Sequence, residues 1–131
     1  MIVVDTSAII AIALDEPEAE PLLTAVSNAD EAFIAAPTAL ELEIVLRSKT
    51  GPQGPSAKQV LQQLAVEIVP FSTEHLAEAI AAFGKFGRGR HPAALNFGDC
   101  FSYGLAKALG APLLFKGDDF ARTDIPSALT P

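Results

Sequence analysis

The sequence is poor in cysteine and in positive charge. Cys100 is the only cysteine in 131 residues, so no internal disulfide, zinc finger or paired-thiol redox site can form within the chain. A lone cysteine fits a reducing compartment, and we expect a cytoplasmic protein. Lysine and arginine number 9 against 16 acidic residues, for a formal net charge of −7. A chain of this charge does not attract nucleic acid through a global positive field, although a bound metal ion can reverse the local sign at a cluster of carboxylates.

Long apolar runs and a basic amino-terminal segment are also missing. The longest run, Ala8–Leu14, is far shorter than the ~20 residues of a membrane-spanning helix, and no basic stretch precedes it as in a secretory signal. Half of the residues are nonetheless hydrophobic, which favours a folded core over disorder. Because the chain shows no repeat and no linker, we expect a single domain over residues 1–131.

Short apolar runs alternate with helical patterns along the chain. Four runs predict strands, at 2–4, 32–35, 66–69 and 113–115, and a short last strand is expected from Ile125. Helices are expected after Ser7, from Pro17 to Val26, from Pro37 to Lys49, from Ser56 to Leu64, from Ser72 to Phe83 and from Gly98 to Leu109, with a basic loop from Gly84 to Pro92. This alternation predicts an α/β fold, a three-layer α/β/α domain with a mostly parallel central sheet of four to five strands.

Acidic residues stand where such a fold places its strand ends and helix starts. Asp5 follows the first strand, Glu41 lies one turn into a helix and Asp99 begins another. Asp118 and Asp119 follow the fourth predicted strand. A parallel sheet brings these positions to its carboxyl edge, where two carboxylates about 4 Å apart repel each other by about 4 kcal/mol at an effective dielectric near 20. Mg²⁺ or Mn²⁺ offsets such repulsion and prefers oxygen ligands.

Each of these acids also has an ordinary structural interpretation. Asp5 and Asp99 are suited to helix caps, Glu41 to a solvated helix face, and the aspartate pair to a turn. All of them in one chain, however, form an arrangement typical of metal-assisted phosphodiester cleavage. A Mg²⁺ phosphatase of the Asp-x-Asp type is disfavoured because the position two residues after Asp5 is a serine.

Four stretches of the chain carry a resemblance to a known family. They are MIVVDTSA at 1–8, the segment 38–46 around Glu41, LNFGDCFSYGLA at 95–106, and LLFKGDDF at 113–120 followed by TDI at 123–125. In this order, and over nearly the whole chain, they resemble the PIN-domain ribonucleases, specifically the VapC toxins of VapBC toxin–antitoxin modules. The resemblance implies a PIN-like α/β/α fold.

The resemblance also assigns roles to individual acids. Asp5, Glu41 and Asp99 match the three most regular acidic positions of the family, which are catalytic and bind metal. The fourth family position varies and falls here on Asp118 or Asp119. We favour Asp118 because it lies nearer the strand end, with Asp119 as a further metal ligand.

Hydroxyl and basic residues complete the expected site. Ser7 matches the small residue that supports the first aspartate in the family, and Thr6 is a second supporting residue. Arg88 and Arg90 lie in a glycine-rich basic loop before Asp99. Arginine suits phosphate oxygens, so we interpret these two as RNA-binding residues, with a solvated loop or an antitoxin contact as the alternatives.

The resemblance implies a function and partners. It predicts a metal-dependent endoribonuclease toxin, using Mg²⁺ or Mn²⁺, that is a homodimer and is neutralised by a VapB-type antitoxin. Transfer RNA and ribosomal RNA both fit as substrates, DNA cleavage is not excluded by the motifs, and a catalytically weak RNA-binding or scaffold module is the alternative. The apolar faces around Ile9, Ile12, Leu42 and Leu46 are expected to form either the groove for an antitoxin helix or simply core.

Overall fold

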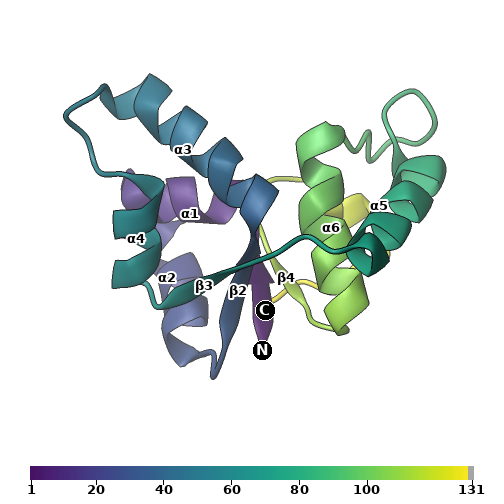
Figure 1. Cartoon of the computed structure of the whole chain (residues 1–131), viewed down its shortest axis with the longest axis horizontal. Helices are drawn as coiled ribbons and strands as arrows, with labels where there is room; N and C mark the ends of the chain where they lie inside the picture. The colour runs from purple at the N-terminus through teal and green to yellow at the C-terminus, as the bar shows by residue number, and fades with distance from the viewer. Residues whose placement is uncertain (130–131) are drawn as a thin grey trace.

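Four strands and six α-helices alternate along residues 1–129, the part of the chain that this computed structural model describes (Figure 1). The strands are β1 Ile2–Val4, β2 Ala32–Ala35, β3 Val66–Val69 and β4 Leu113–Leu114. The helices are α1 Thr6–Ala13, α2 Ala19–Asn28, α3 Ala36–Thr50, α4 Ala57–Gln63, α5 Thr73–Phe86 and α6 Phe97–Leu109, followed by a 3₁₀ turn, η1, at Phe120–Arg122. None of these helices is long and apolar enough to cross a membrane.

The strands form one sheet in the order β3-β2-β1-β4, and every neighbouring pair is parallel. The mostly parallel sheet predicted from the sequence is therefore confirmed, with four strands. The expected last strand from Ile125 is wrong within the described residues, where only a single bridge between Leu113 and Ser127 forms. Because all four strands run the same way, their carboxyl ends lie at one edge of the sheet.

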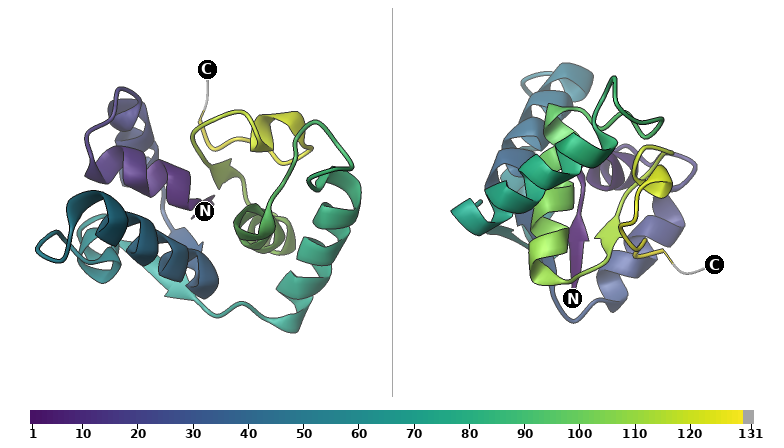
Figure 2. Two further views of the ribbon diagram at one scale, coloured as in Figure 1. Left: turned by 90° about the horizontal axis from the view of Figure 1, so that it is seen from above. Right: turned by 90° about the vertical axis from the view of Figure 1, so that its right-hand side faces the viewer.

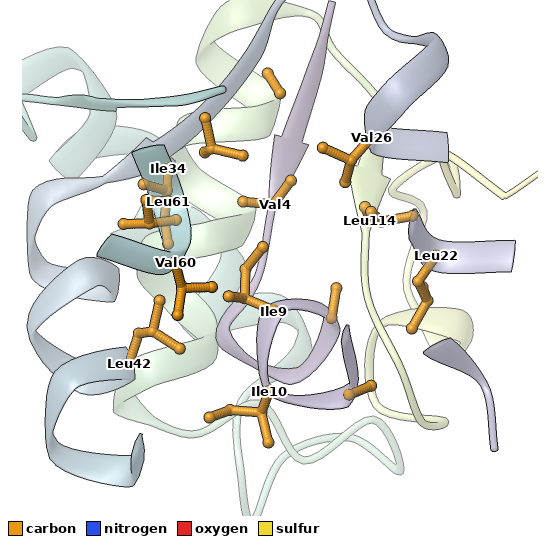
Figure 3. Packing of buried hydrophobic residues seen from close by; sticks show 14 of the residues in the cluster. Val4, Ile9, Ile10, Leu22, Val26, Ile34, Leu42, Val60, Leu61 and Leu114 are labelled. Carbon is orange, nitrogen blue, oxygen red and sulfur yellow. The ribbon is translucent and has the colours of Figure 1, made fainter. Parts of the chain in front are cut away.

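Helices cover both faces of the sheet, which confirms the three layers. Helices α1 to α4 pack on one face, and α5 and α6 pack on the other (Figures 1 and 2). Adjacent residues of a strand point to opposite faces, so Val4 belongs to the core under α1 to α4 and Val3 to the core under α5 and α6. Figure 3 shows the first of these cores, with Val4 and Ile9 near its centre.

Of the two alternatives for the faces around Ile9, Ile12, Leu42 and Leu46, the structure confirms core rather than an antitoxin groove. Ile9, Leu42 and Leu46 are completely buried, and Ile12 packs against the same cluster. The apolar side chains that α3 exposes are instead Leu40 and Ile44, on the other side of the helix.

Helix boundaries follow the predicted caps more closely than the predicted ends. Ser56 and Ser72 each accept a hydrogen bond from the backbone three residues on, as N-caps do. Helix α2 begins at Ala19, two residues after the predicted Pro17. The loop predicted from Gly84 is also wrong at its start, since α5 continues through Gly84 to Phe86. Phe86 is buried and packs near Tyr103 of α6, which holds the last turn in place.

Candidate active site

Asp5 is fixed at the end of β1 by three hydrogen bonds. Its Oδ2 accepts from the Ser7 backbone N–H at 3.1 Å and from the Ser7 hydroxyl at 2.7 Å. Its Oδ1 accepts from the Ser102 hydroxyl of α6 at 2.5 Å. The Lys116 N–H, just after β4, donates to Ser7 Oγ at 3.0 Å. Three segments far apart in the sequence therefore hold this buried carboxylate in one orientation.

Ser102 was not predicted as a site residue. It lies three positions after Asp99, so the two side chains share a face of α6, and its hydroxyl is almost completely buried. A serine on the same face of the helix as Asp99 was the only signal in the sequence. Ser102 can be recognised as a site residue only once the fold shows that Asp5 lies opposite its hydroxyl.

Glu41 approaches the same edge from α3. Its Oε1 accepts from the Thr6 hydroxyl at 2.6 Å, so Thr6 supports Glu41 rather than Asp5. Its Oε2 lies so close to the backbone of Gly98 that an added Cβ atom there would collide with it. A glycine at this position thus lets the glutamate reach the start of α6.

Asp99 lies in the first turn of α6 and closes its capping box. Its Oδ2 accepts from the Asn96 N–H at 3.0 Å, while Asn96 Oδ1 accepts from the Asp99 N–H at 2.9 Å. The pKa of the Asp99 carboxyl is raised to about 6, and burial is the largest cause. The hydrogen bond from the Asn96 N–H lowers this pKa and partly opposes the effect of burial. The charges of Asp5, Asp119 and Glu41 also raise this pKa. Asp5, Glu41 and Asp119 are therefore close enough to Asp99 for their charges to act on it.

Asp118 and Asp119 follow β4 on an exposed loop. Gly117 precedes them with φ of +103°, a left-handed conformation that favours glycine. The charge of Asp119 acts on Asp99, and Asp118 is not among the groups that shift the Asp99 pKa.

The donor set at this edge suits a hard divalent cation. All of the groups are oxygen donors, and a carboxylate that already accepts two or three hydrogen bonds keeps further lone pairs. Within residues 1–129, no three histidine, cysteine or acidic side chains stand close enough together to hold one metal ion as they are. The acids therefore face one region without closing around a common point.

The predicted RNA-binding arginines lie in the segment between α5 and α6. Arg88 is exposed, and its backbone N–H donates to the Leu95 carbonyl at 3.0 Å. The Arg90 guanidinium lies 5.5 Å from the centre of the Phe83 ring, a cation–π distance. Both residues are beside the start of the helix that carries Asp99.

Comparisons with known proteins agree with this fold. A family model described as PIN domain matches residues 2–126. The chain is 43% identical over 130 residues to VapC ribonuclease Mb0640 of Mycobacterium bovis, covering 98% of this chain and 99% of that protein. A crystal structure of Mycobacterium tuberculosis VapC20, described as a sarcin-ricin loop cleaving toxin, superposes with a TM-score of 0.74 at 15% identity over 95% of this chain and 96% of that one. A toxin–antitoxin complex from Klebsiella pneumoniae matches with a TM-score of 0.70 at 17% identity over 95% and 93%. At these low identities the two structures show the fold alone.

Proposed function

The chain belongs to the PIN-domain family as a VapC ribonuclease, and we propose that its acidic edge cleaves RNA phosphodiester bonds with an activated water. The protein is an endoribonuclease toxin of a type II toxin–antitoxin system, with residues 1–131 as one domain. The observation that carries the proposal is the meeting of Asp5, Glu41 and Asp99, from three segments of the chain, at one edge of the sheet. Ser102 of the helix that carries Asp99 donates to Asp5, and Gly98 of the same helix lies against Glu41. Such a concentration of negative charge is unfavourable unless a cation is to be bound there.

Each carboxylate has a defined task in this proposal. Asp5 is held rigid by Ser7 and Ser102 and would fix the position of a Mg²⁺ or Mn²⁺ ion. Glu41 and Asp99 would bind the ion from the two sides of the edge. When bound, a divalent cation lowers the pKa of an attacking water and offsets the negative charge that develops on the phosphate. No side-chain nucleophile is needed.

The fourth acid is one of two neighbours. The sequence favours Asp118, whereas the effect of Asp119 on the Asp99 pKa favours Asp119. Because both side chains are exposed, each can be changed without disturbing the core. Isothermal titration with Mn²⁺ on Asp118→Asn and Asp119→Asn identifies the ligand as the variant with the larger loss of affinity. An equal loss would assign the position to both.

A metal-titrated RNA cleavage assay tests the proposed activity. Cleavage should require Mg²⁺ or Mn²⁺, stop in EDTA and return when the cation is restored. Asp5→Asn should reduce the rate at least ~10²-fold, as removal of a preorganised electrostatic group does. Asp30→Asn, which alters an exposed aspartate outside the site, should match the unmodified protein. Full cleavage in EDTA would refute the mechanism, and RNA binding without any cleavage would instead favour the catalytically weak binding module.

A VapB-type antitoxin is the expected inhibitor. The solved toxin–antitoxin complex with the same fold supports such a partner. We propose that an arginine of the antitoxin pairs with Asp5, Glu41 or Asp99, since a planar guanidinium fits carboxylates bidentately and competes with the metal ion. Coexpression with a VapB-type antitoxin should give an inactive complex that excess Mg²⁺ partly reactivates. Recovery of free, fully active nuclease would defeat the antitoxin assignment and leave the nuclease assignment in place.

A homodimer is the second assembly that we propose. Helices α3, α5 and α6 expose a continuous apolar face, in which Phe97 is 80%, Ile80 64% and Leu40 63% exposed. The face consists of Leu40, Ile44, Leu76, Ile80, Phe83 and Phe97. Six such side chains, at on the order of 100 Å² each, approach the ~800 Å² that one partner buries in a standard interface.

Light scattering coupled to size exclusion tests this dimer. Ile80→Asp should give a monomer, because it places a charge in the buried interface. Leu23→Asp, which makes the same kind of change at an exposed leucine of α2, should leave the dimer intact. A monomeric unmodified protein would refute the homodimer.

A further inference from the structure

The lysine and arginine side chains divide into paired and unpaired groups. Within residues 1–129, Arg47 pairs with Glu43, Lys85 and Lys107 pair with Asp124, and Lys116 pairs with Glu16 and Glu18. The remaining five basic side chains form no ion pair among the described residues; they are Lys49, Lys58, Arg88, Arg90 and Arg122. The paired cations are already committed to carboxylates, so the unpaired ones are the charges most available to an anionic ligand.

Three of the five unpaired cations belong to two segments that contact each other. Arg88 and Arg90 belong to the loop between α5 and α6, and Arg122 ends η1. The Arg122 Nη1 donates to the Pro92 carbonyl at 3.2 Å, which joins η1 to that loop. Lys49 and Lys58 are on α3 and α4, on the opposite side of the molecule (Figure 1).

Both segments that carry these arginines lead directly to the acidic edge. The Arg88 N–H binds Leu95, the residue before Asn96, which caps the helix of Asp99. Arg122 follows Asp119 by a single 3₁₀ turn. The segments that carry the arginines therefore adjoin the acidic edge on the α6 side, whereas the unpaired cations of the α3–α4 side are the two lysines.

We propose that the RNA backbone reaches the acidic edge across the α6 side and that Arg122 is a phosphate-binding residue there, together with Arg88 and Arg90. The inference rests on the proposed ribonuclease function and assigns the path of its substrate. A guanidinium donates in a planar fork that fits two phosphate oxygens, and Arg122 keeps donors beyond the one that binds Pro92. In a chain of net charge −7, such a local cluster supplies the attraction that the whole molecule does not.

Binding of a fluorescent single-stranded RNA, measured by anisotropy over a range of salt concentrations, tests this path. The parent is the Asp99→Asn variant with Mg²⁺ present, in which cleavage is too slow to interfere. Arg88→Ala, Arg90→Ala and Arg122→Ala should each weaken binding several-fold and reduce the slope of log K against log salt by about 0.7, the value for one lost single-strand phosphate contact. Lys49→Ala and Lys58→Ala remove the same charge on the opposite side and should leave binding and slope unchanged.

A further variant distinguishes the effect of losing the Arg122 charge from the effect of losing its hydrogen bond to Pro92. Arg122→Gln keeps an amide donor for Pro92 and removes the charge, so it should reproduce the loss in Arg122→Ala with an unchanged urea midpoint. The inference is overturned if Arg122→Gln binds RNA like the parent, or if the lysine variants weaken binding as much as the arginine variants do. If the unmodified protein cleaves RNA in either case, the proposed function stands and only the path is wrong. Absence of RNA cleavage by the unmodified protein would instead remove the premise.

Discussion

Replacing Asp99 by asparagine should stabilise the metal-free protein while it abolishes most of the activity. The folded protein raises the pKa of this carboxyl from 3.8 to about 6, through burial first and through neighbouring carboxylates next. The carboxyl is still mostly ionised at neutral pH, but its charge is less favourable in the folded protein than in the unfolded chain. Asparagine removes that charge and keeps a side-chain oxygen that can accept the Asn96 N–H.

The size of the effect follows from the pKa. The difference between 3.8 and about 6 corresponds to about 3 kcal/mol at about 1.4 kcal/mol per pH unit, and partial access of solvent to the carboxyl reduces it to about half. Loss of the favourable interaction of a charge with the helix start removes about 0.5 kcal/mol more. A net gain of about 1 kcal/mol remains, which raises the melting temperature by roughly 4 °C in a domain of this size.

The pH dependence has a defined sign. A proton on Asp99 stabilises the fold relative to the ionised group, so this stabilisation is complete below pH 3.8 and is lost as the pH rises through about 6. The advantage of Asp99→Asn should accordingly be full at pH 7.5 and nearly absent at pH 4.

Urea unfolding in EDTA, followed by circular dichroism, measures the difference at both pH values. Asp30→Asn is the matched control, since it removes an exposed aspartate and should show no pH-dependent advantage. With Mg²⁺ added, Asp99→Asn should cleave RNA at least ~10²-fold more slowly than the unmodified protein. A variant that is less stable than the unmodified protein at pH 7.5, or an advantage that does not change with pH, would refute the reasoning.

Three further substitutions test the support of the carboxylates. Ser102→Ala removes the buried donor to Asp5 and should lower the free energy of unfolding by about 1–3 kcal/mol, with slower cleavage; a neutral effect in urea unfolding would contradict this. Gly98→Ala meets the flexible end of Glu41 and should displace that carboxylate, so that cleavage falls while the urea midpoint barely moves. Gly104→Ala instead meets the α5 helix at His75 and Ala79 and should destabilise by about 1–3 kcal/mol with the catalytic edge unaltered. Identical profiles for the two glycine variants would show that the Glu41 carboxylate does not lie against Gly98.

Strands and caps were predictable because their signals are local. Parallel strands are covered on both faces and appear as short, wholly apolar runs, as in Ile2–Val4. The helix caps at Ser56 and Ser72 need only a side chain and its own backbone. The end of α5 could not be predicted from local signals. Gly84 is a poor helix residue, but the tertiary burial of Phe86 keeps the helix going past it.

The faces of α3 could not be assigned from the sequence. This helix has apolar residues on two sides, so periodicity does not show which side is inward. The structure buries Leu42 and Leu46 and exposes Leu40 and Ile44. The sequence also pointed to the acids but not to Ser102. The hydrogen-bond partner of Ser102 is 97 residues away in the sequence, and such a contact leaves no local pattern.

The capping box of α6 gives a backbone amide that reports on Asp99. One carboxylate oxygen accepts the Asn96 N–H, and the same side chain is the one whose ionisation the neighbouring acids oppose. The amide proton of Asn96 therefore senses the charge on Asp99 through a single hydrogen bond. In a nitrogen–proton correlation spectrum its resonance should move with the titration of that carboxyl and shift again when a cation binds. Occupancy of the acidic edge thus becomes visible without any substrate, at the first turn of a helix.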